Sequence, residues 1–128
     1  MRRTFPAFLL LAAMTTGACA GSSSRSASPG ASFAMSPGES VRLPDASTLR
    51  YVRVVADSRC PPDVQCIRAG DAELLFELAP AQGEARQVTV KLPQAPTAAL
   101  GTWTLRVESL SFEAPQQATV RLEESTTR

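Results

Sequence analysis

Residues 71–78 read Asp-Ala-Glu-Leu-Leu-Phe-Glu-Leu. Mostly acidic residues alternate in this stretch with apolar ones, which are Ala72, Leu74, Phe76 and Leu78. A period of two predicts a β-strand with one face in a core and the other facing water, because successive side chains of a strand point to opposite faces. This stretch therefore favours a layered sheet over a helical bundle.

The same alternation recurs on both sides of this strand. It predicts further strands over residues 41–43, 49–56, 87–92, 102–108 and 118–123. Apolar residues of 49–56 fall on both parities, as in a central strand or one with a bulge. After Val107 the apolar positions change from odd to even, which predicts a bulge or a corner near Glu108 and Ser109.

Proline and glycine divide these strands at short intervals, at residues 44–45, 80–83, 93–101 and 115. Such spacing leaves no room for crossover helices. About six or seven antiparallel strands in ~90 residues indicate an all-β fold, an antiparallel β-sandwich that is immunoglobulin-like in outline. A small β-barrel is the alternative architecture.

Length and composition limit the classes of function. A chain of 128 residues is enough for one core. A net charge of +1 without a basic cluster gives no reason to expect a nucleic-acid partner. The chain has no histidine, which removes His-based triads and the common zinc sites. No cofactor and no metal is expected, and the sequence leaves the oligomeric state open.

The N-terminal segment has the pattern of an export signal. Arg2 and Arg3 precede an apolar run over residues 5–14, and small residues follow before Cys19. The run is about half of the ~20 residues that a membrane-spanning helix needs. Residues 1–18 are therefore predicted to be a signal peptide that is removed.

Residues 16–19, Thr-Gly-Ala-Cys, resemble the bacterial lipobox. The resemblance implies that Cys19 becomes the first residue of the mature protein and carries acyl chains such as palmitate, which hold it at the membrane. Ala20 stands where an Asp would imply retention in the inner membrane, so it favours the outer membrane, with the protein facing the periplasm. Secretion without an anchor, or anchoring in the inner membrane, is the alternative location.

A spacer is expected between anchor and domain. Residues 20–32 contain no large apolar side chain and are rich in Ser, Gly and Ala, a composition typical of a flexible tether. The predicted organisation is a lipidated Cys19 with its tether over 19–32, a sandwich domain over 33–124 and a short tail over 125–128.

The stretch 57–70, between two predicted strands, combines cysteine, proline and charged residues at a density that is unusual for a short loop. In an exported chain, Cys60 and Cys66 are expected to form a disulfide. Pro61 stiffens the ring, and Gly70 is expected to adopt a positive φ before the next strand. Asp57 and Asp63 are expected to accept backbone N–H groups in turns.

The loop resembles a group of small bacterial lipoproteins and secreted proteins of uncharacterised function. The shared residues are Asp57-Ser-Arg-Cys-Pro61, four further residues, and then Cys66-Ile-x-Ala-Gly70. In that group a Trp is usual at the position of Arg68. The resemblance implies a fold and a location in the envelope, and it implies no activity.

These observations favour a binding or structural module over an enzyme, with no catalytic residue assigned. The expected interaction loop offers Arg59 and Arg68, with Asp57 and Asp63 as its acids, to an envelope protein. The alternative is an envelope enzyme or redox accessory that uses the Cys60–Cys66 loop or converging carboxylates. The thiol pair lacks the Cys-x-x-Cys spacing of oxidoreductases, and the acids alternate with core residues, so they are expected to be solvated.

Overall fold

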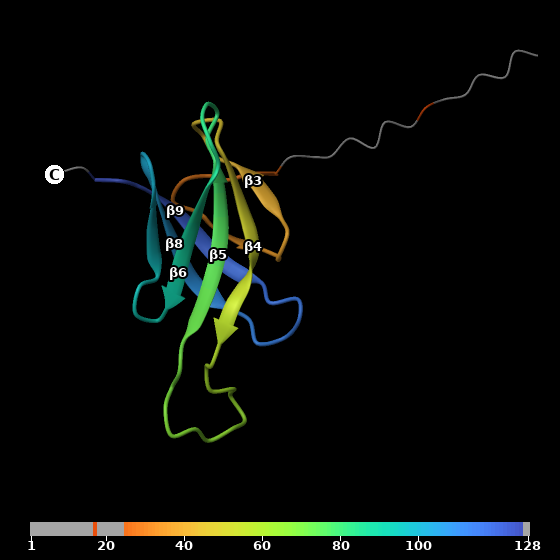
Figure 1. Cartoon of the computed structure of the whole chain (residues 1–128), viewed down its shortest axis with the longest axis vertical. Coiled ribbons are helices and arrows are strands. Elements are labelled where there is room, and N and C mark those ends of the chain that lie inside the picture. Colours follow the sequence, from red (N-terminus) through yellow and green to blue (C-terminus); the bar gives the residue numbers. More distant parts are fainter. Residues whose placement is uncertain (1–16, 18–24, 127–128) are drawn as a thin grey trace, which may run out of the picture.

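The structure is a computed structural model that describes residue 17 and residues 25–126. It contains two sheets packed face to face (Figure 1) and, within the described residues, no helix. The five-stranded sheet has the spatial order β1 (Arg25–Ser26), β3 (Ser40–Arg42), β4 (Thr48–Asp57), β5 (Ala72–Ala79) and β6 (Arg86–Leu92). The four-stranded sheet has the order β2 (Ser32–Met35), β9 (Ala118–Glu124), β8 (Trp103–Leu110) and β7 (Thr97–Leu100).

The predicted all-β sandwich is confirmed, and the sheets do not close into a barrel. All strand pairs are antiparallel except β1 with β3, which is parallel. The alternating apolar residues of β5, which are Ala72, Leu74, Phe76 and Leu78, face the other sheet and are buried. Behind them, Tyr51 of β4 stacks on Phe76 with ring centroids 5.2 Å apart. Burying a side chain of this size stabilises the fold by roughly 1.5–3 kcal/mol, so this alternating strand is the centre of the core.

The bulge predicted in β8 is present. The register against β9 shifts between Val107 and Ser109, which leaves Glu108 as the additional residue. The shift allows both Val107 and Leu110 to face the core despite their different parity. The apolar residues on both parities of β4 have a similar origin, because its register against β5 shifts twice.

The described body is larger than predicted. Strand β1 and the first residue of β2 lie in the segment expected to be a tether, and Ala27 between them is buried. Ordered structure therefore begins by Arg25 and not at residue 33. Ser125, expected in the tail, donates its backbone N–H to the carbonyl oxygen of Thr102 over 2.9 Å.

The number of strands also differs, because β1, β2 and β7 were not predicted, and β7 lies inside the 93–101 stretch that was expected to be a turn. Its short length and the two prolines that precede it hide it from a search for alternation. The predicted signal peptide, apart from Gly17, and Cys19 lie outside the described residues. Among the described residues, no helix is long and apolar enough to span a bilayer.

The two ends of the sandwich differ in what they carry. Residues 58–71, which connect β4 to β5, project from one end (Figure 1). Arg25 pairs with Val41, which pairs with Leu49 near the beginning of β4. Eight residues of β4 separate Leu49 from Asp57, or about 26 Å at ~3.3 Å per residue. The first described strand and the long loop are therefore at opposite ends.

Candidate functional site

The candidate site is the β4–β5 loop, residues 58–71. Cys60 and Cys66 form a disulfide with their Cα atoms 5.8 Å apart, as predicted. The bond closes a small ring at the far end of the loop and leaves the residues nearest the strands outside it. The loop therefore has a base, next to the sheet, and a tip, which is formed by the ring and by the two residues that follow it, Ile67 and Arg68.

Hydrogen bonds between its two arms hold the base of the loop. The Ser58 backbone N–H donates to the Asp71 carbonyl oxygen over 2.8 Å, and the Cys60 N–H donates to the Ala69 carbonyl oxygen over 3.0 Å. Gly70 has the predicted positive φ, at +70°. A Cβ atom on Gly70 would overlap the carbonyl oxygen of Ser58, so only glycine allows the two arms to approach this closely.

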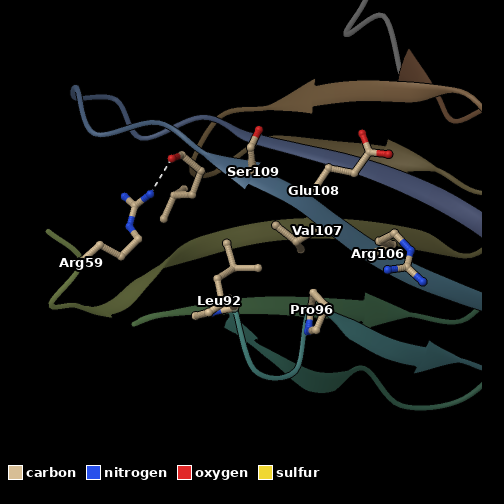
Figure 2. Close-up of a pocket in the computed structure, with 9 residues that line it drawn as sticks. Arg59, Leu92, Pro96, Arg106, Val107, Glu108 and Ser109 are labelled. Atoms are coloured by element: carbon tan, nitrogen blue, oxygen red, sulfur yellow. Dashed lines mark hydrogen bonds between the residues drawn. The ribbon is translucent and has the colours of Figure 1, made fainter. Parts of the chain in front are cut away.

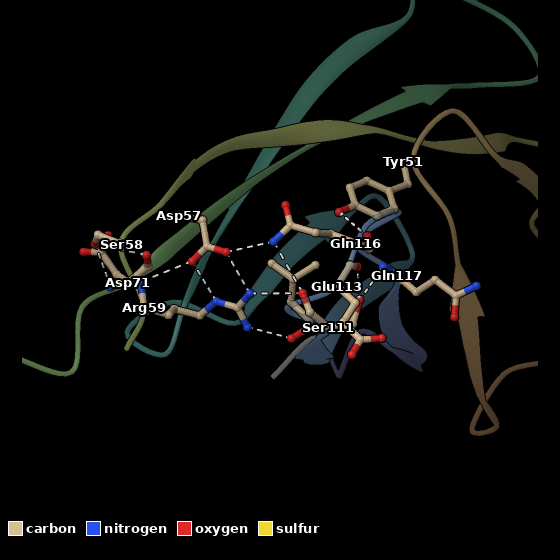
Figure 3. Close-up of polar contacts among 10 residues, drawn as sticks. Tyr51, Asp57, Ser58, Arg59, Asp71, Ser111, Glu113, Gln116 and Gln117 are labelled. Atoms are coloured by element: carbon tan, nitrogen blue, oxygen red, sulfur yellow. Dashed lines mark hydrogen bonds and ion pairs between the residues drawn. The ribbon is translucent and has the colours of Figure 1, made fainter. Parts of the chain in front are cut away.

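An ion pair between Asp57 and Arg59 lies at the base of the loop. Arg59 donates from Nε to Asp57 Oδ1 and from Nη2 to Oδ2, each over 2.8 Å (Figure 3). The Arg59 backbone N–H also donates to Asp57 Oδ1 over 3.1 Å, which is the turn predicted for Asp57. The two side chains are only 14% and 21% exposed. A bidentate pair with this much burial fixes the conformation of both residues.

The same guanidinium reaches the opposite sheet. Its Nη1 donates to the carbonyl oxygen of Leu110 over 2.6 Å and its Nη2 to that of Ser111 over 3.2 Å. It also lies 4.0 Å from the centre of the Phe112 ring, which gives a cation–π contact. Gln116 Nε2 donates to Asp57 Oδ2 over 2.8 Å (Figure 3). The base of the loop is thus fastened to both sheets.

The pKa values of Asp57 and Tyr51, at the base of the loop, reflect these contacts. The side-chain hydrogen bonds from Arg59 are the main reason why the pKa of Asp57 falls from 3.8 to about 2. Beneath it, burial raises the pKa of Tyr51 to about 12. The Tyr51 hydroxyl donates to the Gln116 carbonyl oxygen over 3.0 Å, so the neutral phenol ties β4 to the β8–β9 loop.

The tip of the loop is exposed. Ile67 has 104% of its reference surface accessible and Val64 has 54%. Asp63 and Arg68 flank them, and neither side chain makes a hydrogen bond or an ion pair with any described residue. The tip therefore offers two aliphatic side chains and one charge of each sign to solvent.

The four predicted interaction residues divide into two pairs. Asp63 and Arg68 lie on the exposed tip, and the turn hydrogen bond predicted for Asp63 is not among those of the described residues, whereas the one predicted for Asp57 is present. Arg59 was expected to be a polar contact for a partner, and this is wrong, because its guanidinium is almost buried and every one of its nitrogens already donates. Asp57 is its partner at the base.

Sequence reasoning missed two features of the site. The exposed aliphatic residues Val64 and Ile67 were visible as apolar letters in an otherwise polar loop. The partners of Arg59 at Leu110 and Ser111 are 51 and 52 positions away, and no local pattern points to them. Within the described residues, no group of three or more acids or cysteines gathers to hold a metal ion; Asp71, for example, pairs with Lys91 over 3.3 Å.

Comparison of the chain with known protein families, with curated proteins and with solved structures found no match. The function is therefore argued from the site itself.

Proposed function

We propose that this chain is a lipid-anchored binding protein of the bacterial cell envelope, attached through Cys19 to the outer membrane and facing the periplasm. Its binding element is the tip of the β4–β5 loop, and its partner is another envelope protein. The proposal assigns it no reaction.

The single observation that carries the proposal is the exposure of Ile67 on a loop that is held in place. Exposed aliphatic side chains are unfavourable in water, and burying one stabilises a complex by roughly 1.5–3 kcal/mol. Here the disulfide, Gly70 and Arg59 restrict the loop before any partner binds. Little conformational entropy then remains to be lost on binding, which favours recognition by a rigid surface.

The polar residues of the tip favour a protein over a charged ligand. Asp63 and Arg68 together carry no net charge, so the tip has no preference for polyanions such as nucleic acid. An apolar centre with a polar rim is the usual composition of a protein–protein contact. Val64 enlarges the apolar centre beside Ile67.

The position of the loop supports a partner away from the anchoring membrane. The chain enters the sandwich at Arg25, at the end opposite to the loop (Figure 1). A lipid anchor at Cys19 would lie on that same side, so the loop would project into the periplasm. The disulfide also suits an oxidising compartment of this kind.

Photo-crosslinking in intact cells tests the proposal. A photoreactive amino acid replaces Ile67 in one strain and Gln82 in another. Gln82 is also solvent-exposed but lies in the β5–β6 turn at the other end of the sandwich (Figure 1). We expect a discrete crosslinked protein of defined mass from position 67 and none from position 82.

Two results would contradict the proposal. One is the absence of any crosslinked protein at position 67 when the folded protein is present at its normal level. The other is an identical pattern of products at both positions, because that would reflect random collision in a crowded periplasm. A partner identified by mass spectrometry is then tested with Ile67→Ser and Val64→Ser, which remove the apolar contact and leave the base of the loop intact.

A further inference from the structure

Two exposed arginines lie close together on the outer face of the five-stranded sheet, where β3 and β4 run side by side (Figure 1). Arg42 comes from β3 and Arg50 from β4. Arg42 lies opposite Thr48, which is two residues before Arg50 along β4. Diagonal neighbours of this kind are about 7 Å apart, so the two side chains share one region of surface.

A bulge in β4 brings Arg53 to the same face. Arg53 lies opposite Leu75, which alternates with the buried residues of β5 and therefore faces outward. The register between β4 and β5 shifts just before Arg53. Without that additional residue, positions 50 and 53 would point to opposite faces, because successive side chains of a strand alternate. Arg42, Arg50 and Arg53 together form what we call the arginine patch.

The positive charge of the arginine patch is only partly balanced. None of its three guanidiniums makes a hydrogen bond or an ion pair with any residue that the structure describes. Glu77 of β5 lies opposite Arg50 but forms no ion pair with it. Nearby, Glu39 pairs with Arg25 over 2.7 Å, and Asp45 accepts hydrogen bonds inside the β3–β4 turn. Three guanidiniums on this face thus oppose one carboxylate, and the patch attracts anions.

The hollow beside β8 shows that arginines alone do not make such a patch. Arg59 and Arg106 contribute to the lining of this hollow, whose volume is about 600 Å³ (Figure 2). Arg59 donates to Asp57 and to the carbonyl oxygen of Leu110. Arg106 Nε lies 3.1 Å from Glu123 Oε1. Both charges are compensated, so an anion is attracted to the arginine patch and not to this hollow.

The arginine patch lies beside the strand through which the chain enters the sandwich. Ser26 of β1 pairs with Arg42 in the parallel β1–β3 ladder. Only residues 20–24 separate Arg25 from the proposed lipid anchor at Cys19. A chain of that length spans at most roughly 20 Å. An anchor at Cys19 therefore keeps the patch within reach of lipid headgroups.

We propose that the arginine patch binds anionic phospholipid headgroups of the membrane that carries the anchor. A planar guanidinium suits this ligand, because it donates two parallel hydrogen bonds to one phosphate. The contact turns the β3–β4 side of the sandwich toward the bilayer and so fixes the direction in which the loop tip projects. Binding of this kind rests on the function proposed above, because it requires the anchor at Cys19, but it does not depend on Ile67.

The strength expected of the patch is modest. Each basic residue near an anionic bilayer strengthens the attraction about five-fold. Three such residues orient a protein that is already anchored, but they are too few to retain it without acyl chains.

Chemical modification of arginine tests the contact. The lipidated protein is purified from membranes and reconstituted in nanodiscs of phosphatidylcholine alone, or of phosphatidylcholine and phosphatidylglycerol in equal parts. Phenylglyoxal then modifies accessible guanidiniums, and mass spectrometry gives the rate at each position. We expect the three arginines of the patch to react several-fold more slowly in the anionic nanodiscs. Arg68 is the internal control and should react equally fast in both, because it lies on the loop tip, at the other end of the sandwich.

A matched pair of variants separates the patch from general surface charge. Arg50→Gln removes the central guanidinium, and the protection of Arg42 and Arg53 should weaken by up to about five-fold. Arg68→Gln removes one charge outside the patch and should leave that protection unchanged. Both side chains are exposed and make no hydrogen bond with a described residue, so both variants should fold. High salt should abolish the protection in the wild type, because it screens the attraction.

Several outcomes would overturn the proposal. Equal rates at the patch in the two lipids would show that headgroups do not cover it, and protection that persists at high salt would show that charge does not hold the contact. Equal slowing at Arg68, or protection that Arg50→Gln leaves unchanged, would also overturn it. The mass of the purified protein is measured first, because a chain without acyl groups would remove the anchor and this contact together. An acylated chain with unprotected arginines would remove only this contact, and the function proposed for Ile67 would still be judged by its crosslinking test.

Discussion

At the scale of single residues, the loop depends on the ion pair of Asp57 with Arg59. Arg59 makes contacts that no lysine could reproduce, because one planar guanidinium donates to a carboxylate and to two carbonyl oxygens of the other sheet. Its charge stays compensated by Asp57 in a largely buried setting. The pair therefore acts as a structural joint between the sheets, and it orients the first residues of the loop.

The free energy of unfolding should depend on pH through the ionisation of Asp57. Its pKa is about 2 in the folded protein against an ordinary value of 3.8. A carboxyl group with a lowered pKa stabilises the fold fully above its unfolded pKa, and this contribution is lost as the pH falls from about 4 to about 2. We expect it to amount to about 1 kcal/mol at pH 7, because water screens part of the interaction at this partly exposed carboxylate. Urea unfolding at a series of pH values measures it.

Asp57→Asn is the control for this prediction. The amide keeps the shape of the carboxylate but has no charge to lose, so the stability difference between wild type and variant should shrink toward zero near pH 2. A difference that stays constant from pH 7 to pH 2 would contradict the role given to the charge.

A single methyl group at Gly70 should destabilise the protein. Gly70→Ala combines a positive φ with an overlap between the new Cβ and the Ser58 carbonyl oxygen. We expect a loss of about 2 kcal/mol or more in the free energy of unfolding. Gly101→Ala is the matched control, since Gly101 has a similar φ of +75° and open space around it. Its loss should be about 1 kcal/mol, and equal losses in both variants would disprove the close approach.

At the scale of the elements, the sequence was sufficient to predict the strands in which apolar and polar side chains alternate. The pattern of Ala72, Leu74, Phe76 and Leu78 predicted β5, and the change of parity after Val107 predicted the bulge in β8. The alternation did not predict β1, β2 or β7, which are only two to four residues long. β1 and β7 are held by backbone pairing with β3 and β8, and their small or polar side chains carry little hydrophobic signal.

The features of the candidate site also divide into those that the sequence predicted and those that it did not. The disulfide, the turn at Asp57 and the positive φ of Gly70 arise from residues close in sequence, and all three were predicted. The burial of Arg59 depends on the β8–β9 loop, which reaches it only after both sheets have packed together. Long-range contacts of this kind have no local signature, so Arg59 was mistaken for an exposed contact.

Removal of the disulfide should loosen the tip and leave the base in place. In Cys60→Ser with Cys66→Ser, the bonds between Ser58 and Asp71 lie outside the ring and remain possible. Loss of the crosslink should lower the free energy of unfolding by roughly 2–3 kcal/mol. Limited proteolysis should cut the variant between residues 61 and 67 while the sandwich stays intact. Resistance equal to that of the oxidised wild type would show that the disulfide does not order the tip.

At the scale of the whole molecule, the two ends of the sandwich separate the beginning of the first described strand from the proposed binding loop. The chain enters at Arg25, and the loop begins at the other end of the sandwich, about 26 Å away along β4 (Figure 1). The loop tip is therefore accessible to a partner on the side away from the proposed anchor. A rigid core between these regions keeps their spacing constant, which suits a protein that holds a partner at a fixed distance from a membrane.

The proposed anchor itself gives the last prediction. Acyl chains on Cys19 should be the main attachment to the membrane, since each buried methylene contributes about 0.8 kcal/mol and several chains make dissociation negligible. We expect wild-type protein in the membrane fraction, released by detergent, and labelled when cells grow with an alkyne analogue of palmitate. Cys19→Ser should remove the label and prevent membrane retention. Because residue 19 precedes the first described strand, which begins at Arg25, the thermal unfolding of the sandwich should not change.

Ser23→Ala, four residues further along, is the control and should keep both the label and the membrane location. Unlabelled wild type, or a Cys19→Ser protein that still sediments with membranes, would contradict the anchor and leave the loop tip without its fixed orientation.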